Sequence, residues 1–269
     1  MNKPLPINLI DFNIGVGKGK PLTINGEKRS CPFCNVGTLT DIIDTKEDMI
    51  FLKNKYIVLE PSDQFVLIEG ADCNSDMNLY TPEKMTSLIS FGISHWLKLW
   101  ETGKYKAVLF FKNYGPLSGG TIHHPHMQIV GLPVIDPDLM FSTDEFEGIP
   151  VATESGVEIN VATRPRIGFS EINILVKKQF TASDISSPQA YETLSALAHY
   201  IQSSVTFLKD FFKRENFSYN IFFYLLDGCI RVKLLPRFAT SPLYIGYSIH
   251  LKPTNLADTA EKLRTYIWA

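Results

Sequence analysis

The sequence lacks long hydrophobic runs and any excess of charge of one sign, and each absence excludes a class of protein. No stretch approaches the ~18 consecutive apolar residues that a membrane-spanning helix needs, so we expect neither a membrane span nor a membrane partner. The first residues lack the long apolar core of a secretory signal, which favours a cytoplasmic location. The 26 Lys and Arg against 28 Asp and Glu leave a net charge of −2. A protein that coats nucleic acid would be far more basic, so we expect no nucleic-acid partner.

Cysteine is also scarce, and the cysteines present do not suit a disulfide scaffold. Four cysteines in 269 residues, unevenly spaced, are too few to hold a chain of this length together. In a reducing compartment, clustered thiols are more often metal ligands. Apolar residues are plentiful by contrast: 45% of the chain is hydrophobic and 12% aromatic, which excludes wholesale disorder and provides for a sizeable core.

Hydrophobic periodicity predicts a similar order of elements in both halves of the chain. Short apolar runs between turn residues are typical of antiparallel strands, and longer runs with a period of about 3.6 residues predict helices. In the first half we expect strands at 49–52, 56–59 and 65–68, a helix at 81–101, and strands at 108–111 and 122–130. After a connector at 132–148 we expect strands near 150–163 and 167–177, a helix at 187–215, strands at 218–226, 229–235 and 243–250, and a helix at 256–267. This order predicts an α+β fold.

The run His123-His124-Pro125-His126-Met127-Gln128 is the sharpest local feature of the sequence. Side chains alternate along a strand, so His124, His126 and Gln128 would project from one surface. Pro125 cannot donate to a neighbouring strand, which indicates a strand start or an edge. Three polar side chains in a row seldom belong to a core. A functional surface and an exposed, polar edge strand are the two interpretations left open.

Cys31 and Cys34 have the C-x2-C spacing of half a tetrahedral zinc site. Two further ligands are needed, and His124 and Cys73 are the candidates. A Cys3His site of this kind would tie the N-terminal arm to the histidine strand. The competing interpretation is a pair of free thiols that are buried for packing.

The glycine-rich run Gly15-Val16-Gly17-Lys18-Gly19-Lys20 looks superficially like a phosphate-binding loop. It lacks the Gly-x4-Gly-Lys-Ser/Thr spacing of such loops. A flexible turn is therefore the better interpretation.

Three segments in this order resemble the galactose-1-phosphate uridylyltransferase branch of the histidine-triad superfamily. They are Cys31-Pro32-Phe33-Cys34, Leu52-Lys53-Asn54-Lys55-Tyr56, and Phe111-Lys112-Asn113-Tyr114-Gly115 running through Ser118 to His124-Pro125-His126-Met127-Gln128. The resemblance covers residues 29–132; beyond them it rests on element order and on Pro236-Arg237. It implies two histidine-triad-like halves, each an antiparallel sheet with a packed helix, which we place at 1–135 and 136–269.

The resemblance implies a role for each matching residue. His126 would attack the α-phosphorus of the substrate and form a covalent nucleotidyl-histidine, and Gln128 would hydrogen-bond the phosphoryl oxygens without offering an acidic proton. The implied nucleoside contacts are Phe51, Asn54 and Tyr56. The implied phosphate contacts are Asn113, Ser118, Gly119 and Gly120. The implied ligands of a structural zinc are Cys31, Cys34, Cys73 and His124.

Two departures from the family pattern bear on function. The family carries a His-x-His pair on a strand before Pro-Arg, and the corresponding segment here, Cys229 to Arg237, lacks both imidazoles, so we expect no second metal site. The segment ending at Ser248 lacks a final Glu, which disfavours a hexose 1-phosphate acceptor.

The sequence therefore predicts a nucleotidyltransferase that acts on a nucleoside diphosphate sugar or a dinucleoside polyphosphate. A nucleotide hydrolase or phosphorylase of the same superfamily is one alternative. A non-catalytic nucleotide-binding protein on a degenerate scaffold is the other, because the second half lacks the His-x-His pair of the family. The expected partner is a nucleotide or nucleotide sugar, and the resemblance also allows a homodimer.

Overall fold

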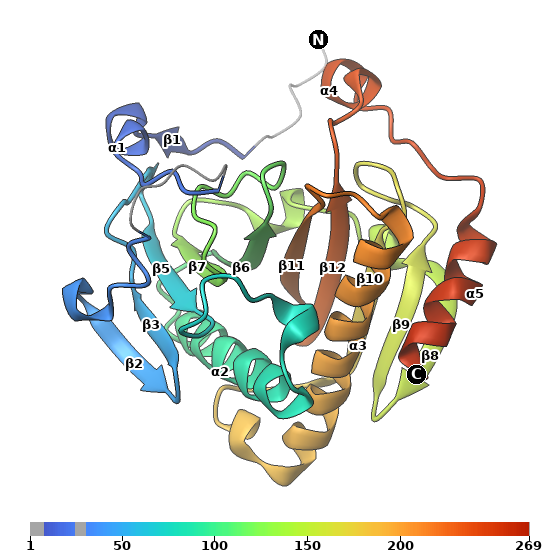
Figure 1. Ribbon diagram of the computed structural model, residues 1–269, viewed down its shortest axis with the longest axis horizontal. Coiled ribbons are helices and arrows are strands. Elements are labelled where there is room, and N and C mark those ends of the chain that lie inside the picture. Colours follow the sequence, from blue (N-terminus) through green and yellow to red (C-terminus); the bar gives the residue numbers. More distant parts are fainter. Residues whose placement is uncertain (1–7, 25–30, 269) are drawn as a thin grey trace.

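The computed structural model describes residues 8–24 and 31–268, and its main feature is one ten-stranded sheet (Figure 1). Its strands are β2 (Ile42–Lys46), β3 (Met49–Lys53), β5 (Asp63–Ile68), β6 (Ala107–Tyr114), β7 (His126–Leu132), β8 (Gly148–Glu154), β9 (Val157–Ala162), β10 (Ile172–Gln179), β11 (Ser218–Leu226) and β12 (Cys229–Arg237). The α-helices are α1 (Ile14–Lys18), α2 (Pro82–Glu101), α3 (Pro188–Phe212), α4 (Pro242–Tyr247) and α5 (Leu256–Ile267). β1 (Asp11–Phe12) and β4 (Leu59–Glu60) form a separate pair. None of the described helices is both long and apolar enough to cross a membrane.

The sheet consists of two similar halves that meet at its centre. The strand order is β2-β3-β5-β7-β6-β11-β12-β10-β9-β8, and each pair is antiparallel. In each half the long helix follows the third strand, α2 after β5 and α3 after β10. The predicted α+β fold with two such halves is confirmed. The structure adds that β6 and β11 join the two sheets into one, which leaves neither strand with an open edge.

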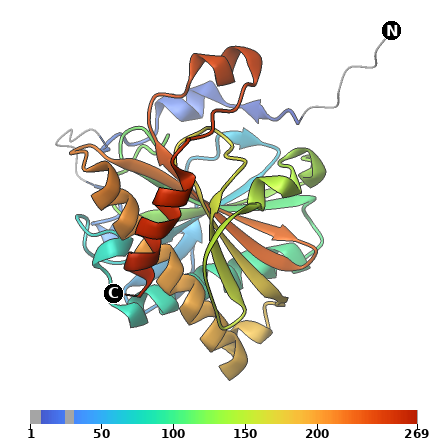
Figure 2. The ribbon, with the colours of Figure 1, turned by 90° about the vertical axis from the view of Figure 1, so that its right-hand side faces the viewer.

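All the long helices cover one face of the sheet, here called the helix face. Helices α2 and α3 each begin with a proline behind an N-cap, and the caps Thr81 and Ser187 accept hydrogen bonds from the first turn. Strand residues at alternate positions, such as Met127 and Ile129, join Trp96 and the other apolar residues of these helices in one large core. Figure 2 shows α3 and α5 together on this side. The residues between, such as His126 and Gln128, point to the opposite face, here called the cavity face.

Some predicted elements differ from the observed ones, each for a local reason. The strand predicted at 243–250 is wrong: Ser241 caps α4 and Pro242 stands at its first position, so a short helix forms. The strand predicted at 150–163 is a hairpin, because Ser155 and Gly156 turn the chain with positive φ angles. The last strand of the first half begins at His126 rather than at 122. Pro125 has no N–H for the ladder, which explains that start.

Candidate active site

His126 begins β7 on the cavity face, and its hydrogen bond decides which ring nitrogen is free. Its Nδ1 lies 2.8 Å from the backbone oxygen of His124. A carbonyl can only accept, so Nδ1 carries the proton and Nε2 keeps its lone pair. Burial is the main reason that the pKa of His126 falls to about 4, and nearby Lys112 lowers it further. The ring is therefore neutral near pH 7, with a nucleophilic nitrogen available.

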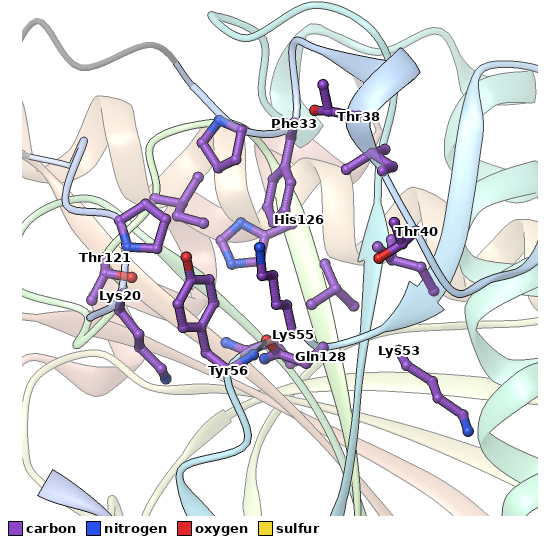
Figure 3. A pocket seen from close by; sticks show the side chains of 18 of the residues that line it. Lys20, Phe33, Thr38, Thr40, Lys53, Lys55, Tyr56, Thr121, His126 and Gln128 are labelled. Carbon is purple, nitrogen blue, oxygen red and sulfur yellow. Dashed lines mark hydrogen bonds between the residues drawn. The ribbon is translucent and has the colours of Figure 1, made fainter. Parts of the chain in front are cut away.

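A cavity of about 300 Å³ lies in front of this ring. Figure 3 shows the imidazole among the side chains of Phe33, Tyr56 and Lys55. Phe33 packs edge-on to the imidazole, with ring centroids 5.4 Å apart. The predicted site residues that line the cavity are Asn54, Tyr56, Gly119, Gly120, His126 and Gln128. Residue 54 comes from one segment and residues 120 and 126 from another, so the fold brings the two segments together.

The cavity is electropositive, and sequence reasoning missed most of that charge. Lys20, Lys53 and Lys55 line it, and no Asp or Glu is among its described lining residues. Burial lowers the pKa of Lys20. Such a wall suits a ligand with several negative charges.

Lys20 is the last residue of the glycine run that we interpreted as a flexible turn. The first four residues of that run, 15–18, are helical and belong to α1. The backbone N–H of Thr23 bonds to the oxygen of Thr121 at 2.8 Å, and the Thr23 hydroxyl accepts from the His123 N–H at 3.0 Å. These contacts hold the arm against the histidine segment. No local signal in the sequence could have revealed them.

Three predicted substrate residues are not among the residues that line the cavity. Phe51 lies on the helix face, stacked 5.5 Å from Phe65 and 4.1 Å from His95 between ring centroids, because its neighbour Leu52 takes the cavity face. Phe51 therefore does not line the cavity. Ser118 is buried; its hydroxyl donates to the Gly115 oxygen at 2.7 Å and so shapes the loop.

Asn113 is the third of these residues, and it lies beneath that loop. Its Oδ1 accepts a hydrogen bond from Asn220 at 2.6 Å. A Cβ atom added at Gly120 would lie 3.2 Å from the Asn113 Cβ, so the loop passes directly over it. Asn113 therefore lies directly beneath the loop of the site, beside the cavity but not among its described lining residues.

The four predicted metal ligands come together. One ligand atom from each of Cys31, Cys34, Cys73 and His124 lies within 4.8 Å of the others. His124 Nε2 donates to the Gly70 oxygen at 2.8 Å, which turns Nδ1 toward the sulfurs of Cys31 and Cys34, at 3.6 and 3.5 Å. Burial, followed by the neighbouring thiols, raises the pKa of Cys73 to about 12. Three thiols and an imidazole gathered this closely fit a site that a cation completes.

A buried ion pair supports the start of β7 from the helix face. Lys112 Nζ lies 2.5 Å from Glu69 Oε1, and both side chains are almost fully buried. The backbone N–H of Glu69 bonds to the Pro125 oxygen at 3.1 Å, next to the start of β7. Lys112 is therefore a structural partner of Glu69 behind His126.

Comparisons with known proteins identify the fold and the family. The DUF4931 family models, a domain of unknown function, match residues 12–135 with the N-terminal domain and residues 138–267 with the C-terminal domain. A solved DUF4931 family protein from Bacillus cereus is 40% identical, with 85% of this chain and 100% of that chain covered and a TM-score of 0.72. No curated protein matches the chain significantly.

Two more distant structures share the fold. A uridylyltransferase is 16% identical over 90% of this chain and 92% of its own, with a TM-score of 0.72. An ADP-glucose phosphorylase from Arabidopsis thaliana, solved with ADP-glucose, is 14% identical over 92% of this chain and 93% of its own, with a TM-score of 0.67. The expected likeness to the uridylyltransferase branch is confirmed at the level of fold. On its identity to the Bacillus cereus protein, the chain belongs to the DUF4931 family.

Proposed function

We propose that the protein transfers a nucleoside monophosphate group by way of a covalent bond to Nε2 of His126. In the first step Nε2 attacks the α-phosphorus, the bond to the leaving oxygen breaks, and the leaving phosphate keeps the electron pair. In the second step an acceptor oxygen attacks the same phosphorus and releases Nε2. The hydrogen bond from Nδ1 to the His124 oxygen stabilises the charge that the ring gains in the intermediate. The observation that carries this proposal is the neutral Nε2 next to a cavity lined by lysines.

The lysines and the lack of a base favour transfer over hydrolysis. Water needs a base to become a good nucleophile, and the described lining residues offer no carboxylate and no second imidazole. A phosphate acceptor is already anionic, and Lys20, Lys53 and Lys55 would hold it. Gln128, on the same face as His126, offers an amide that can bond the phosphoryl oxygens. The donor is then a nucleoside diphosphate sugar or a dinucleoside polyphosphate, and the acceptor carries a phosphate.

We assign the metal to zinc and its role to structure. Three sulfurs and one imidazole nitrogen are the donor set that zinc prefers, and a fully protein-ligated site of this kind is closed to substrate. When bound, zinc would join the arm, the loop after β5 and the start of β7. Within this proposal residues 1–135 carry the chemistry and residues 136–269 form a degenerate half, with Cys229 and Arg231 outside the cavity lining.

A donor screen with intact mass measurement tests the proposal. The protein is incubated with UDP-glucose, ADP-glucose and diadenosine tetraphosphate, and its mass should increase by one nucleoside monophosphate. His126→Ala should abolish the increase, whereas His123→Ala, at an exposed neighbour, should retain it. An adduct that survives His126→Ala, or no adduct with any donor, refutes covalent transfer.

The acceptor is identified in a second stage. The isolated adduct is mixed with buffer alone, inorganic phosphate or a sugar 1-phosphate, and the released nucleotide is analysed. Discharge by phosphate or a sugar phosphate supports a phosphate acceptor. Equally fast discharge by buffer alone would make the protein a hydrolase.

A further inference from the structure

We propose that Arg237, in the second half, orients the side-chain amide of Asn113 so that it presents N–H groups, not its oxygen, to the transferred phosphoryl group. This inference rests on the proposed function and assigns Arg237 and Asn220 as positioning residues. Nothing in the histidine strand itself could supply this control.

A chain of hydrogen bonds runs from Arg237 to Asn113 across three neighbouring strands. Arg237 Nη1 donates to Asn220 Oδ1 at 2.7 Å. Asn220 Nδ2 donates to Asn113 Oδ1 at 2.6 Å and to the Ser118 backbone oxygen at 3.0 Å. β6 and β11 are adjacent, with Asn113 and Asn220 directly opposite each other. The chain therefore links the second half to both the sheet and the glycine-rich loop of the site.

The charged end of the chain sets its direction. A guanidinium has only donors, so the Asn220 oxygen must face Arg237. The Asn220 NH2 group must then face Asn113, where its two hydrogens meet two acceptors. The oxygen of Asn113 is thereby occupied. Its NH2 group is the part of the amide that remains to bind a ligand.

Asn113 is well placed for that task. The last pair of the β6 and β7 ladder is Lys112 with Met127, so continuing the register by one places Asn113 opposite His126. Residues 111 and 128 form the preceding pair on the cavity face. Asn113 lies two residues after 111 and His126 two residues before 128, so both face the same side. The Cα atoms of opposite residues in antiparallel strands lie about 4.5–5.5 Å apart. An amide oxygen at this position would repel an anionic phosphoryl group, whereas an NH2 group would bind it.

The surroundings of Arg237 agree with a directional role rather than an ion pair. Among residues 8–24 and 31–268, no carboxylate pairs with its guanidinium, and its buried Nε has no hydrogen-bond partner. Burial lowers the pKa of Arg237, yet an arginine remains a charged donor at neutral pH. Arg237 is half-buried, and a cation held there without a counter-ion is not explained by a stabilising ion pair.

The loop has a separate anchor, which lets the two effects be told apart. The Leu117 N–H donates to the Ser218 hydroxyl at 3.0 Å, and Gly115, with φ of 80°, packs so closely on Ser218 that a Cβ would lie 2.5 Å from its Oγ. Ser218 pairs with Arg237 across the β11–β12 ladder, but neither contact uses the Arg237 side chain. Removing the Arg237 charge should therefore disturb the amide direction more than the position of the loop.

The experiment measures the rate of nucleotidyl-adduct formation in four variants. Arg237→Met should lower this rate about 10- to 100-fold at a saturating concentration of the nucleotide donor, with a smaller change in KM. The reason is that an N–H group that hydrogen-bonds the transition state is lost. Arg237→Lys keeps a donor-only cation and should recover most of the rate. Asn220→Asp retains a hydrogen-bond acceptor for Arg237 but offers no N–H to Asn113. The Asn113 oxygen should then turn toward the phosphoryl group and slow transfer at least as much as Arg237→Met does. The matched control is Arg231→Met: Arg231 lies on the same strand but donates to the Val176 oxygen, and it should have no effect.

A double variant separates positioning from general damage. In an Asn113→Ala background, Arg237→Met should slow the reaction less than about threefold further, since both changes remove the same interaction. A full additional loss in that background, or an equal loss in Arg231→Met, overturns the inference.

A measurement without substrate keeps this test independent of the proposed function. The side-chain amide protons of Asn220 should exchange slowly with water in the wild type and much faster in Arg237→Met, by NMR on ¹⁵N-labelled protein. If the wild type forms no adduct, the proposed function fails while the exchange data still decide whether the chain exists. Equal exchange in the two proteins overturns the inference.

Discussion

His124 and His126 are coupled through one hydrogen bond, 2.8 Å from the His126 Nδ1 to the His124 backbone oxygen. The side chain of His124 lies with the cysteines, while its backbone defines the tautomer of His126. A rigid metal centre would therefore also hold the imidazole that faces the cavity. Pro125 lies between them, which removes one backbone donor and starts β7 at His126.

Loss of one metal ligand should lower both the metal content and the thermal stability of the protein. We expect Cys34→Ser to reduce bound zinc from about one ion per chain to well under half, because a tetrahedral site loses a thiolate. The midpoint of thermal unfolding should fall, since the arm and the loop after β5 are no longer joined. Elemental analysis and thermal scans measure both effects.

Cys229→Ser is the matched control for that variant. Cys229 is half-buried in β12 and is not part of the four-residue cluster. Its replacement should leave metal content unchanged. Equal metal content in Cys34→Ser and the wild type would contradict the site.

Lys20 should contribute to substrate affinity. We expect Lys20→Met to raise the donor KM about tenfold or more, because a charge-assisted hydrogen bond to phosphate contributes about 1.5–3 kcal/mol. Steady-state kinetics with the best donor of the screen provide the measurement. Lys18→Met removes an exposed lysine of α1 that does not line the cavity, and it should leave KM unchanged.

Gln128 should protect the covalent intermediate from water. We expect Gln128→His to shorten the lifetime of the adduct in buffer by about tenfold or more, because an imidazole can serve as a general base for water. The decay of the adduct mass with time measures this lifetime. An unchanged lifetime would mean that the amide has no part in favouring transfer.

The Glu145–Arg166 pair should stabilise the protein above about pH 4. Glu145 Oε2 lies 2.8 Å from Arg166 Nε, and both side chains are largely buried. Burial alone would raise the pKa of Glu145, but the hydrogen bond and charge of Arg166 hold it below its ordinary value. A lowered folded-state pKa means that the stabilisation is present above the unfolded-state pKa of about 4.3 and is lost as the pH falls through the folded-state pKa.

Glu145→Gln tests that assignment. It should lower the free energy of unfolding by about 1–2 kcal/mol at pH 7, and the difference from the wild type should shrink as the pH approaches 3. Urea unfolding at several pH values measures it. Asp144→Asn removes the partner of Arg164 in an exposed pair nearby and should have no measurable effect at pH 7.

The features that depend on neighbouring residues could be predicted from the sequence. Alternation along β7 put His126 and Gln128 on one face, and both line the cavity. The C-x2-C spacing indicated half of a metal site, and the Cys34 N–H bonds to the Cys31 oxygen at 3.2 Å. The predicted helix starts at 81 and 187 agree with α2 and α3, which Thr81 and Ser187 cap. In each case the deciding contact spans only a few residues.

Features that join distant segments were decided by the tertiary structure. Phe51 and Leu52 point to opposite faces of the sheet, because side chains alternate along a strand. Only the packing of α2 determined which of the two faces the cavity. Lys20 reaches the cavity through contacts of its arm with residues 121–123, and Asn220 meets Asn113 from 107 residues away along the chain. Hydrophobic periodicity determines which side chains share a face. It carries no information about which strands become neighbours, because that choice depends on the packing of the whole sheet.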